Sequence, residues 1–141
     1  MFVLDTDHLS LLQWPDSAPG HRIWQRICEI GSGRVLTTII TYEEQSRGWL
    51  SYKGRARTIT EELEAYRLLR KHLENYRTID VLDFDQEASW GYQRLQRLSL
   101  RIGSMDLKIA AIVLVHGATL LSRNLQHFRQ IPGLKVEDWA V

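Results

Sequence analysis

Short runs of β-branched and other apolar residues alternate along this chain with longer stretches in which apolar residues recur every three or four positions. The short runs are typical of strands, and the longer stretches are typical of amphipathic helices. Strands are expected at 2–4, 35–39, 79–82, 119–121 and 134–136. Helices are expected from Thr6 or Asp7 to Leu12, from about Ala18 to Ile30 after a loop that starts at Pro15, from Thr41 onward, at 57–76, at 84–98 and at 105–116. The alternation predicts an α/β fold with a mainly parallel sheet.

Two of the expected helices differ in the arrangement of their apolar residues. In 57–76 the apolar residues form one stripe, and charged residues point outward on the other faces. The members of the stripe are Ile59, Leu63, Tyr66, Leu69, Leu73 and Tyr76, and the outward charges are Glu61, Glu62, Arg67 and Lys71. The helix 105–116 is apolar nearly all round, which predicts that it is buried, and Ser104 is its expected N-cap.

Composition sets limits on the class of protein. At 141 residues with 44% hydrophobic and 25% charged residues, the chain fits a single globular domain spanning 1–141. The net charge of +1 excludes an overall basic field. Because Cys28 is the only cysteine, an intramolecular disulfide and a cysteine-based zinc site are both excluded. No apolar run is long enough for a membrane span and no secretion signal is recognised, so a cytoplasmic protein is expected.

Polar residues with metal-binding chemistry follow the expected strands. Asp5 ends the first strand, Glu44 lies in the first turn of the helix after the second, Asp106 lies in the first turn of the buried helix, and Asn124 follows the strand 119–121. In a parallel sheet the carboxyl ends of the strands share one edge, so these residues can converge. Carboxylates without histidine or cysteine suit Mg²⁺ or Mn²⁺. An acid near a helix start is also often only a cap or a partner of the helix dipole.

The helical period separates Glu43 from Glu44. Glu43 is spaced to form a solvated ion pair with Arg47, whereas Glu44 shares a face with the small residues Gly48 and Ser51. Glu44 is therefore the better candidate ligand. Another face of the same helix is expected to pack, and its members are Tyr42, Gln45, Trp49 and Tyr52.

Several segments match a known family in order and spacing, namely Phe2–Ser10, Thr38–Gly48, Ile102–Ala111 and Gly117–Phe128, followed by Ile131–Leu134 and Glu137–Trp139. Taken together, they resemble the PIN domain, and specifically the VapC-type toxins of toxin–antitoxin pairs. The resemblance runs from end to end, and it is weaker from about 53 to 95. It implies a PIN-like three-layer fold with about four to five strands and a metal-dependent endoribonuclease, a hydrolase of RNA.

The resemblance also implies residue roles and partners. Asp5, Glu44 and Asp106 would hold Mg²⁺ or Mn²⁺, and Asn124 would be a fourth catalytic residue. Asp7 stands where the family often has Asn and is expected to cap or to support the ligands. The implied partners are an RNA substrate, a cognate antitoxin protein and a second copy of the chain in a homodimer, with no membrane involved. Aromatic residues that can line a partner surface, or simply pack in the core, are Trp49, Tyr52, Tyr66 and Tyr76.

Two other functions stay open on the sequence. One is a catalytically silent PIN-like module that binds proteins, which the neutral Asn124 favours and the three intact acids oppose. The other is a Mg²⁺-dependent phosphatase or DNA nuclease with a similar acidic edge. A phosphatase of the aspartyl-phosphate type needs a second Asp beside the first, a part that Asp7 can imitate, but its later lysine and aspartate motifs are not evident.

Overall fold

The computed structural model describes residues 1–14 and 16–141. Within them, five strands form one sheet in the order β3-β2-β1-β4-β5, and every neighbouring pair is parallel. The strands are β1 (Phe2–Leu4), β2 (Val35–Thr38), β3 (Asp80–Leu82), β4 (Thr119–Leu121) and β5 (Lys135–Glu137). The expected α/β fold with a mainly parallel sheet of four to five strands is therefore confirmed.

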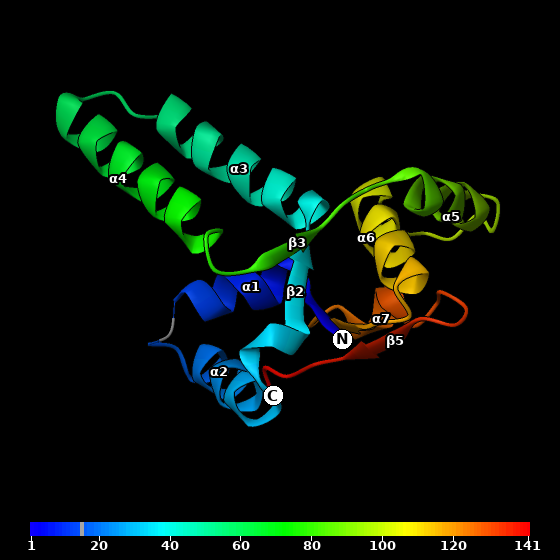
Figure 1. Cartoon of the computed structure of the whole chain (residues 1–141). Helices are drawn as coiled ribbons and strands as arrows, with labels where there is room; N and C mark the ends of the chain where they lie inside the picture. Colours follow the sequence, from blue (N-terminus) through cyan, green and yellow to red (C-terminus); the bar gives the residue numbers. More distant parts are fainter. Residues whose placement is uncertain (15) are drawn as a thin grey trace.

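Helices connect the strands and cover the sheet (Figure 1). They are α1 (Thr6–Gln13), α2 (Ala18–Ile30), the 3₁₀ turn η1 (Ser32–Arg34), α3 (Ile39–Gly54), α4 (Ile59–Asn75), α5 (Gln86–Gln96), α6 (Ser104–Val115) and α7 (Leu125–Phe128). The expected helix from about Ala18 begins there, while Pro15, where a loop was expected, lies outside the described residues. Among the described helices, none combines the length and the apolar character that a membrane crossing requires.

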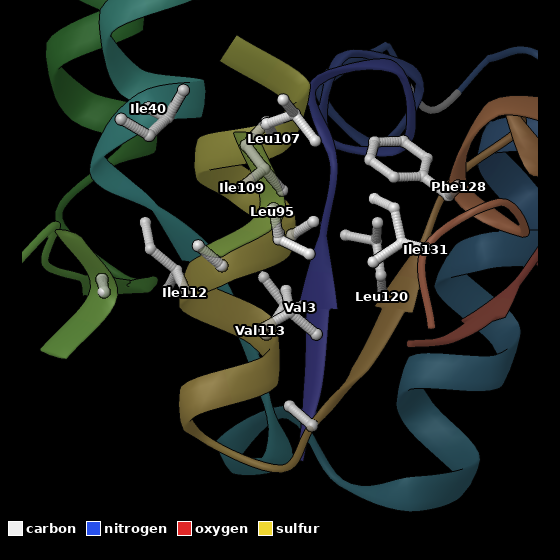
Figure 2. Packing of buried hydrophobic residues seen from close by; sticks show 14 residues of the cluster. Val3, Ile40, Leu95, Leu107, Ile109, Ile112, Val113, Leu120, Phe128 and Ile131 are labelled. Carbon is white, nitrogen blue, oxygen red and sulfur yellow. The ribbon is translucent and has the colours of Figure 1, made fainter. Parts of the chain in front are cut away.

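The central strands are apolar on both faces because both faces are covered. Val3 of β1 and Leu120 of β4 belong to a core shared with α5, α6 and α7, whereas the next residues, Leu4 and Leu121, belong to a core shared with α1, α2 and Trp139. Successive side chains of a strand point to opposite faces, so neighbours in sequence enter different cores. Figure 2 shows the first core, with residues of α6 lying beside β1.

The chain order places a switch point between β1 and β4. The chain leaves β1 outward through β2 to β3 and then returns to the other side of β1 to form β4 and β5. At such a point the connections after neighbouring strands diverge, and a crevice opens at their carboxyl ends. Leu4 is paired in register with Leu121, so Asp5 and Ser122 leave the sheet side by side.

Several helix starts differ from the expectations by a residue or more. Asp5, rather than Thr6 or Asp7, caps α1 by accepting a hydrogen bond from the backbone N–H of Thr6. Ile39 was expected to end a strand, but it opens α3, because the Thr38 side chain caps that helix. Ser104 lies inside α6, whose N-cap is Gly103 and has no side-chain hydrogen bond.

The apolar stripe of α4 is not a core face. Its side chains are largely exposed, with Ile59 at 71%, Leu63 at 67%, Tyr66 at 54% and Leu73 at 50%. Its buried residues are instead Ala65, Leu68 and His72. The reason is the placement of α4, which packs mainly on α3 and projects with it away from the sheet (Figure 1). We refer to α3 and α4 together as the arm.

Candidate functional site

Asp5 lies at the centre of the candidate site. Its side chain is only 6% exposed, and its two carboxylate oxygens accept hydrogen bonds from the Thr6 N–H at 2.7 Å and from the Ser122 hydroxyl at 2.7 Å. Burial, followed by the negative charge of Asp7, raises the pKa of Asp5 to about 7, with a smaller effect from Asp106. The two hydrogen bonds act in the opposite direction and do not cancel the shift.

Glu44 reaches the site from α3. It lies in the second turn, one turn later than expected, because α3 starts at Ile39. Its carboxylate accepts a hydrogen bond from the Thr6 hydroxyl at 3.2 Å, and that hydroxyl also lies 3.3 Å from the hydroxyl of Thr41. Burial raises the pKa of Glu44, and the charge of Asp106 adds to the rise. The neighbouring Glu43 instead forms the expected ion pair with Arg47 at 2.6 Å.

Asp106 supplies the third carboxylate from the first turn of α6. Its pKa is raised by burial and by the charge of Asp7, while His127 acts in the opposite direction. The charge of Asp106 in turn raises the pKa values of Asp5 and Glu44. Asp106 therefore lies on the same side of the molecule as Asp5 and Glu44, and Asp5 and Glu44 are linked through Thr6, whose N–H and hydroxyl contact one carboxylate each.

Asn124 lies at the same edge but is directed differently. Its backbone N–H donates to the Ser122 hydroxyl at 3.0 Å, and its side-chain nitrogen lies 2.9 Å from Nδ1 of His127. The structure thus brings Asn124 to the β4 side of the site, with its amide against His127 and without a hydrogen bond to any of the three acids in the described residues. His127 connects the two sides, because its charge lowers the pKa of Asp106.

Asp7 links the site to the C-terminal strand region. One carboxylate oxygen lies 2.8 Å from Nδ1 of His8, and the other accepts hydrogen bonds from the backbone N–H of Arg123 at 3.0 Å and the hydroxyl of Ser122 at 3.4 Å. His8 is fully buried, and its Nε2 lies 3.0 Å from the backbone N–H of Trp139, which donates to it. Since Nε2 accepts, Nδ1 carries the proton and donates to Asp7. Asp7 therefore supports the site, as expected, but does not cap the helix.

The donor set fits a hard divalent cation by its chemistry. Asp5, Glu44 and Asp106 offer only carboxylate oxygens, and within residues 1–14 and 16–141 no Lys or Arg forms an ion pair with any of them. Converging acids that raise one another's pKa are stabilised by a bound cation. The described side chains do not form a ready-made cage, since no group of three or more His, Cys, Asp or Glu has the arrangement to hold a metal ion. Hydrogen bonds from Thr6 and Ser122 orient two of the acids instead.

Sequence reasoning alone gave Thr6, His8 and Ser122 no such roles. The hydroxyls of Thr6 and Ser122 each contact a candidate ligand, and His8 supports Asp7. Thr6 and His8 lie within the Asp-rich turn after β1, and Ser122 directly follows β4. Their positions after the two central strands are the signal that could have identified them.

Sequence comparisons agree with the geometry. Residues 2–134 match the family described as PIN domain. The chain is similar to Ribonuclease VapC2 of Rickettsia felis, with 32% identity over 65 residues, covering 43% of this chain and 48% of the relative. It is also similar to the tRNA(fMet)-specific endonuclease VapC of Salmonella typhimurium, with 35% identity over 66 residues, covering 44% of this chain and 50% of the relative. The chain spans about half the length of the curated relatives it matches.

Solved structures extend the likeness to the whole fold. VapBC2 from Rickettsia felis bound to a DNA fragment from their promoter superposes with a TM-score of 0.71 at 20% identity, covering 98% of both chains. A toxin–antitoxin complex from Klebsiella pneumoniae gives a TM-score of 0.62 at 19% identity, covering 99% of this chain and 98% of the other. At these identities the likeness concerns the fold. Because the family match covers nearly the whole chain, this protein belongs to the PIN domain family.

Proposed function

We propose that this protein is a metal-dependent endoribonuclease, the toxin of a type II toxin–antitoxin pair, which hydrolyses phosphodiester bonds of RNA in the cytoplasm. The observation that carries the proposal is the placement of Asp5 and Glu44 at the switch point of the sheet, where Thr6 contacts both carboxylates and the charge of Asp106 raises the pKa of each. The similarity to relatives named as a ribonuclease and as a tRNA(fMet)-specific endonuclease supports RNA as the substrate.

The proposed roles follow from the contacts of each side chain. Asp5, Glu44 and Asp106 would hold Mg²⁺ or Mn²⁺, and a bound ion of this kind lowers the pKa of a water molecule and offsets charge on the scissile phosphate. The hydroxyls of Ser122 and Thr6 orient the carboxylates of Asp5 and Glu44 through the hydrogen bonds described above. Asn124 and His127 lie on the β4 side, where they can contact the substrate or an ordered water molecule.

Cleavage of a total small-RNA pool by purified protein tests the proposal, with Mg²⁺ or Mn²⁺ and with EDTA. Asp5→Asn, Glu44→Gln and Asp106→Asn are each expected to lower the rate by on the order of a thousandfold, because each removes a charged ligand. Glu43→Gln is the matched control, since Glu43 pairs with Arg47 beside the site, and it should cleave like the parent protein. Full cleavage by all three acid variants would contradict the assignment of the site.

The same assay separates the other two functions. A folded, metal-supplied protein that cleaves no RNA in any pool would favour the silent binding module. Turnover of a phosphate monoester or of DNA in place of RNA would favour the phosphatase or the DNA nuclease. We rank the ribonuclease first because the relatives that match this chain are named for cutting RNA.

Two apolar surfaces fit the proposed protein partners. A groove of about 620 Å³ lies between α1, α2 and α4, with Leu9, Leu12, Trp24 and Ile27 among its lining residues. A groove of this kind suits an amphipathic helix, and we assign it to the cognate antitoxin. The exposed stripe of the arm suits a symmetric contact between two copies in a homodimer. The likeness to a toxin–antitoxin complex supports the antitoxin partner.

A further inference from the structure

The net charge of +1 conceals two oppositely charged parts of the molecule. Residues 88–136 contain seven Lys and Arg but a single acid, Asp106, so their net charge is +6. The remaining residues contain eleven Lys and Arg and sixteen Asp and Glu, so their net charge is −5. The basic residues of 88–136 are Arg94, Arg97, Arg101, Lys108, Arg123, Arg129 and Lys135.

The basic segment builds mainly one side of the fold, and acids border it at the start of α5 and in β5, namely Asp85, Glu87 and Glu137. Residues 88–136 build most of α5, all of α6, β4 and α7, and the start of β5. In Figure 1, α5, α6 and α7 lie to the right of β1 and β2, while the arm, α1 and α2 lie to the left. The carboxylates of the candidate site lie where the two parts meet, because Asp5 and Glu44 come from one part and Asp106 from the other.

The cations of the two parts are used differently. On the arm, four Lys and Arg side chains form ion pairs with Glu, namely Arg47 with Glu43, Lys53 with Glu62, Arg67 with Glu64 and Arg70 with Glu74. In residues 88–136 no Lys or Arg forms an ion pair with any described carboxylate. Their positive charge is therefore available to a ligand from outside the molecule.

Three of these arginines precede Asp106 in the chain, on α5, at its C-cap and in the connection into α6. The exposed residues of α5 and its C-cap include Trp90, Arg94 and Arg97, at spacings of four and three, whereas Ala88, Gly91 and Leu95 are buried. The exposed Arg101 then lies in the connection that leads into α6 shortly before Asp106. On the other side of the site, the backbone N–H of Arg123 contacts Asp7 while its side chain is exposed.

Trp90 adds a different kind of contact beside these arginines. Its side chain is 53% exposed, at a spacing of four residues from Arg94. A flat aromatic surface beside arginines suits stacked, unpaired bases, with the backbone phosphates on the cations. A duplex keeps its bases paired and offers none to stack.

A cluster of acids also needs cations beside it. Asp5, Asp7, Glu44 and Asp106 repel a polyanion, and screening at physiological salt limits the attraction from cations beyond about 8 Å. Cations must therefore lie next to the acids if a phosphodiester is to approach them. Arg101 and Arg123 adjoin the site in the chain, one before Asp106 and one after Ser122.

We propose that single-stranded RNA enters the site along a basic face formed by Trp90, Arg94, Arg97, Arg101 and Arg123, with phosphates on the arginines and a base stacked on Trp90. This proposal rests on the proposed ribonuclease function, since it names the form of the substrate and its path.

The test measures binding of a fluorescein-labelled, unstructured RNA of 20 nucleotides to the Asp106→Asn protein over a series of salt concentrations. Adding Arg94→Ala, Arg97→Ala and Arg101→Ala together is expected to weaken binding at least about tenfold, and to lower the slope of log K against log salt by about two. The matched control removes three exposed arginines from the acidic part, Arg34→Ala, Arg57→Ala and Arg77→Ala. It should change affinity less than about twofold, because the charge lost lies away from the path.

Trp90→Ala separates stacking from charge. It is expected to weaken binding of the single strand by about tenfold without changing the salt slope, and to leave binding of a 20-base-pair RNA duplex unchanged. Equal losses in the basic-face triple variant and its control would overturn the proposal, because affinity would then follow net charge alone. Tighter binding of the duplex than of the single strand would also overturn it.

Two further measurements separate RNA binding on this face from self-association and from catalysis. The mass of each variant is measured by light scattering, and a changed mass together with lost binding would reassign the face to a contact between copies of the chain. Cleavage by proteins with intact acids is measured in parallel. If the triple variant binds and cleaves RNA like the parent, the basic face is not the RNA-binding surface, and the assignment as a ribonuclease stands. If RNA binding depends on the arginines but no protein with intact acids cleaves RNA, the basic face stands and the assignment as a ribonuclease fails.

Discussion

Helices α6 and α4 both carry large apolar side chains, but these have opposite surroundings. In α6 the side chains of Ile109, Ile112 and Val113 are fully buried, whereas in α4 Ile59 and Leu63 are 71% and 67% exposed. Both sets of residues are apolar, so the difference comes from what lies next to each helix. α6 lies on β1 and carries Asp106 into the site, while α4 packs on α3 (Figures 1 and 2). An apolar pattern therefore identifies a face that is buried in the functional protein, but it does not tell whether the same chain or a partner buries it.

The largest expected difference between the two helices is in stability. Ile112→Ala should lower the free energy of unfolding by about 2–5 kcal/mol, because it leaves a cavity between α6 and the sheet. Leu63→Ala on the arm should change the stability of the monomer by less than about 0.5 kcal/mol, because its side chain is mostly in water already. Urea denaturation at low protein concentration measures both values.

The same pair of variants tests the proposed use of the arm. Leu63→Ala should weaken self-association, which light scattering detects as a shift from dimer toward monomer, whereas folded Ile112→Ala should associate like the parent. A large loss of monomer stability in Leu63→Ala would show that the apolar stripe of α4 is buried within the monomer, like that of α6. Unchanged self-association in that variant would place the contact between copies elsewhere.

A second prediction concerns the pH dependence of stability, which comes from the buried Asp5 at the edge of the sheet where α6 begins. The pKa of Asp5 is about 7 in the folded protein against 3.8 for the free side chain, so the folded state binds more protons between these values. The free energy of unfolding should then fall as the pH rises from about 4 to about 7. Asp5→Asn keeps a side-chain oxygen for the cap of α1 and removes the charge, so it should be more stable than the parent at pH 7.5, by at most about 4 kcal/mol.

Urea titrations of the parent and Asp5→Asn in EDTA, from pH 4 to 8, measure this gap. It should be near zero at pH 4, widen toward pH 7.5 and narrow again when Mg²⁺ or Mn²⁺ is added, because a cation offsets the carboxylate charge. A gap that stays constant across the pH range would mean that the charge of Asp5 is not destabilising in the folded protein.

The smallest expected change in stability comes from the helix cap of α4, and it tests whether the arm is separate from the main core. The Thr58 hydroxyl caps α4 by accepting a hydrogen bond from the Glu61 N–H at 3.1 Å, and the Glu61 carboxylate accepts one from the Arg57 N–H at 2.7 Å. Thr58→Ala should cost about 1 kcal/mol in urea denaturation, and Thr58→Ser should restore most of it. A loss as large as that of Ile112→Ala would show that the arm is part of the main core.

The strands and the order of helices and strands along the chain were predicted well from the sequence, because the signals for them are local. Apolar runs such as Phe2–Leu4 and Thr119–Leu121 are covered on both faces, so nearly every side chain in them is apolar. Helix starts were predicted less well, because several polar residues can cap the same helix. Asp5 caps α1 although Thr6 and Asp7 were also suitable, and only the path of the chain out of β1 decides among them.

The assignment of the acids as site residues stays a prediction, and most of the side chains that orient them were not identified from the sequence. Asp5, Glu44 and Asp106 could be placed together because strand ends share an edge. The contacts of Ser122 and Thr6 with the carboxylates depend on the register of β1 with β4 and on the orientation of α3, which no local pattern encodes. The exposure of the apolar stripe on α4 was missed for a related reason, since the stripe itself does not show what lies beside it.

The contacts of the first strand have a consequence for the order of events during synthesis. Asp5 and Asp7 are made before Ser122, Arg123 and Trp139, which hold them or their neighbour His8 and follow their partners by 116 to 131 residues. At about 5–20 residues per second, a ribosome needs on the order of ten seconds to make the intervening chain. Until then the carboxylates lack these hydrogen bonds. A nascent chain of the proposed ribonuclease therefore lacks the contacts that orient its acids while it is still on the ribosome.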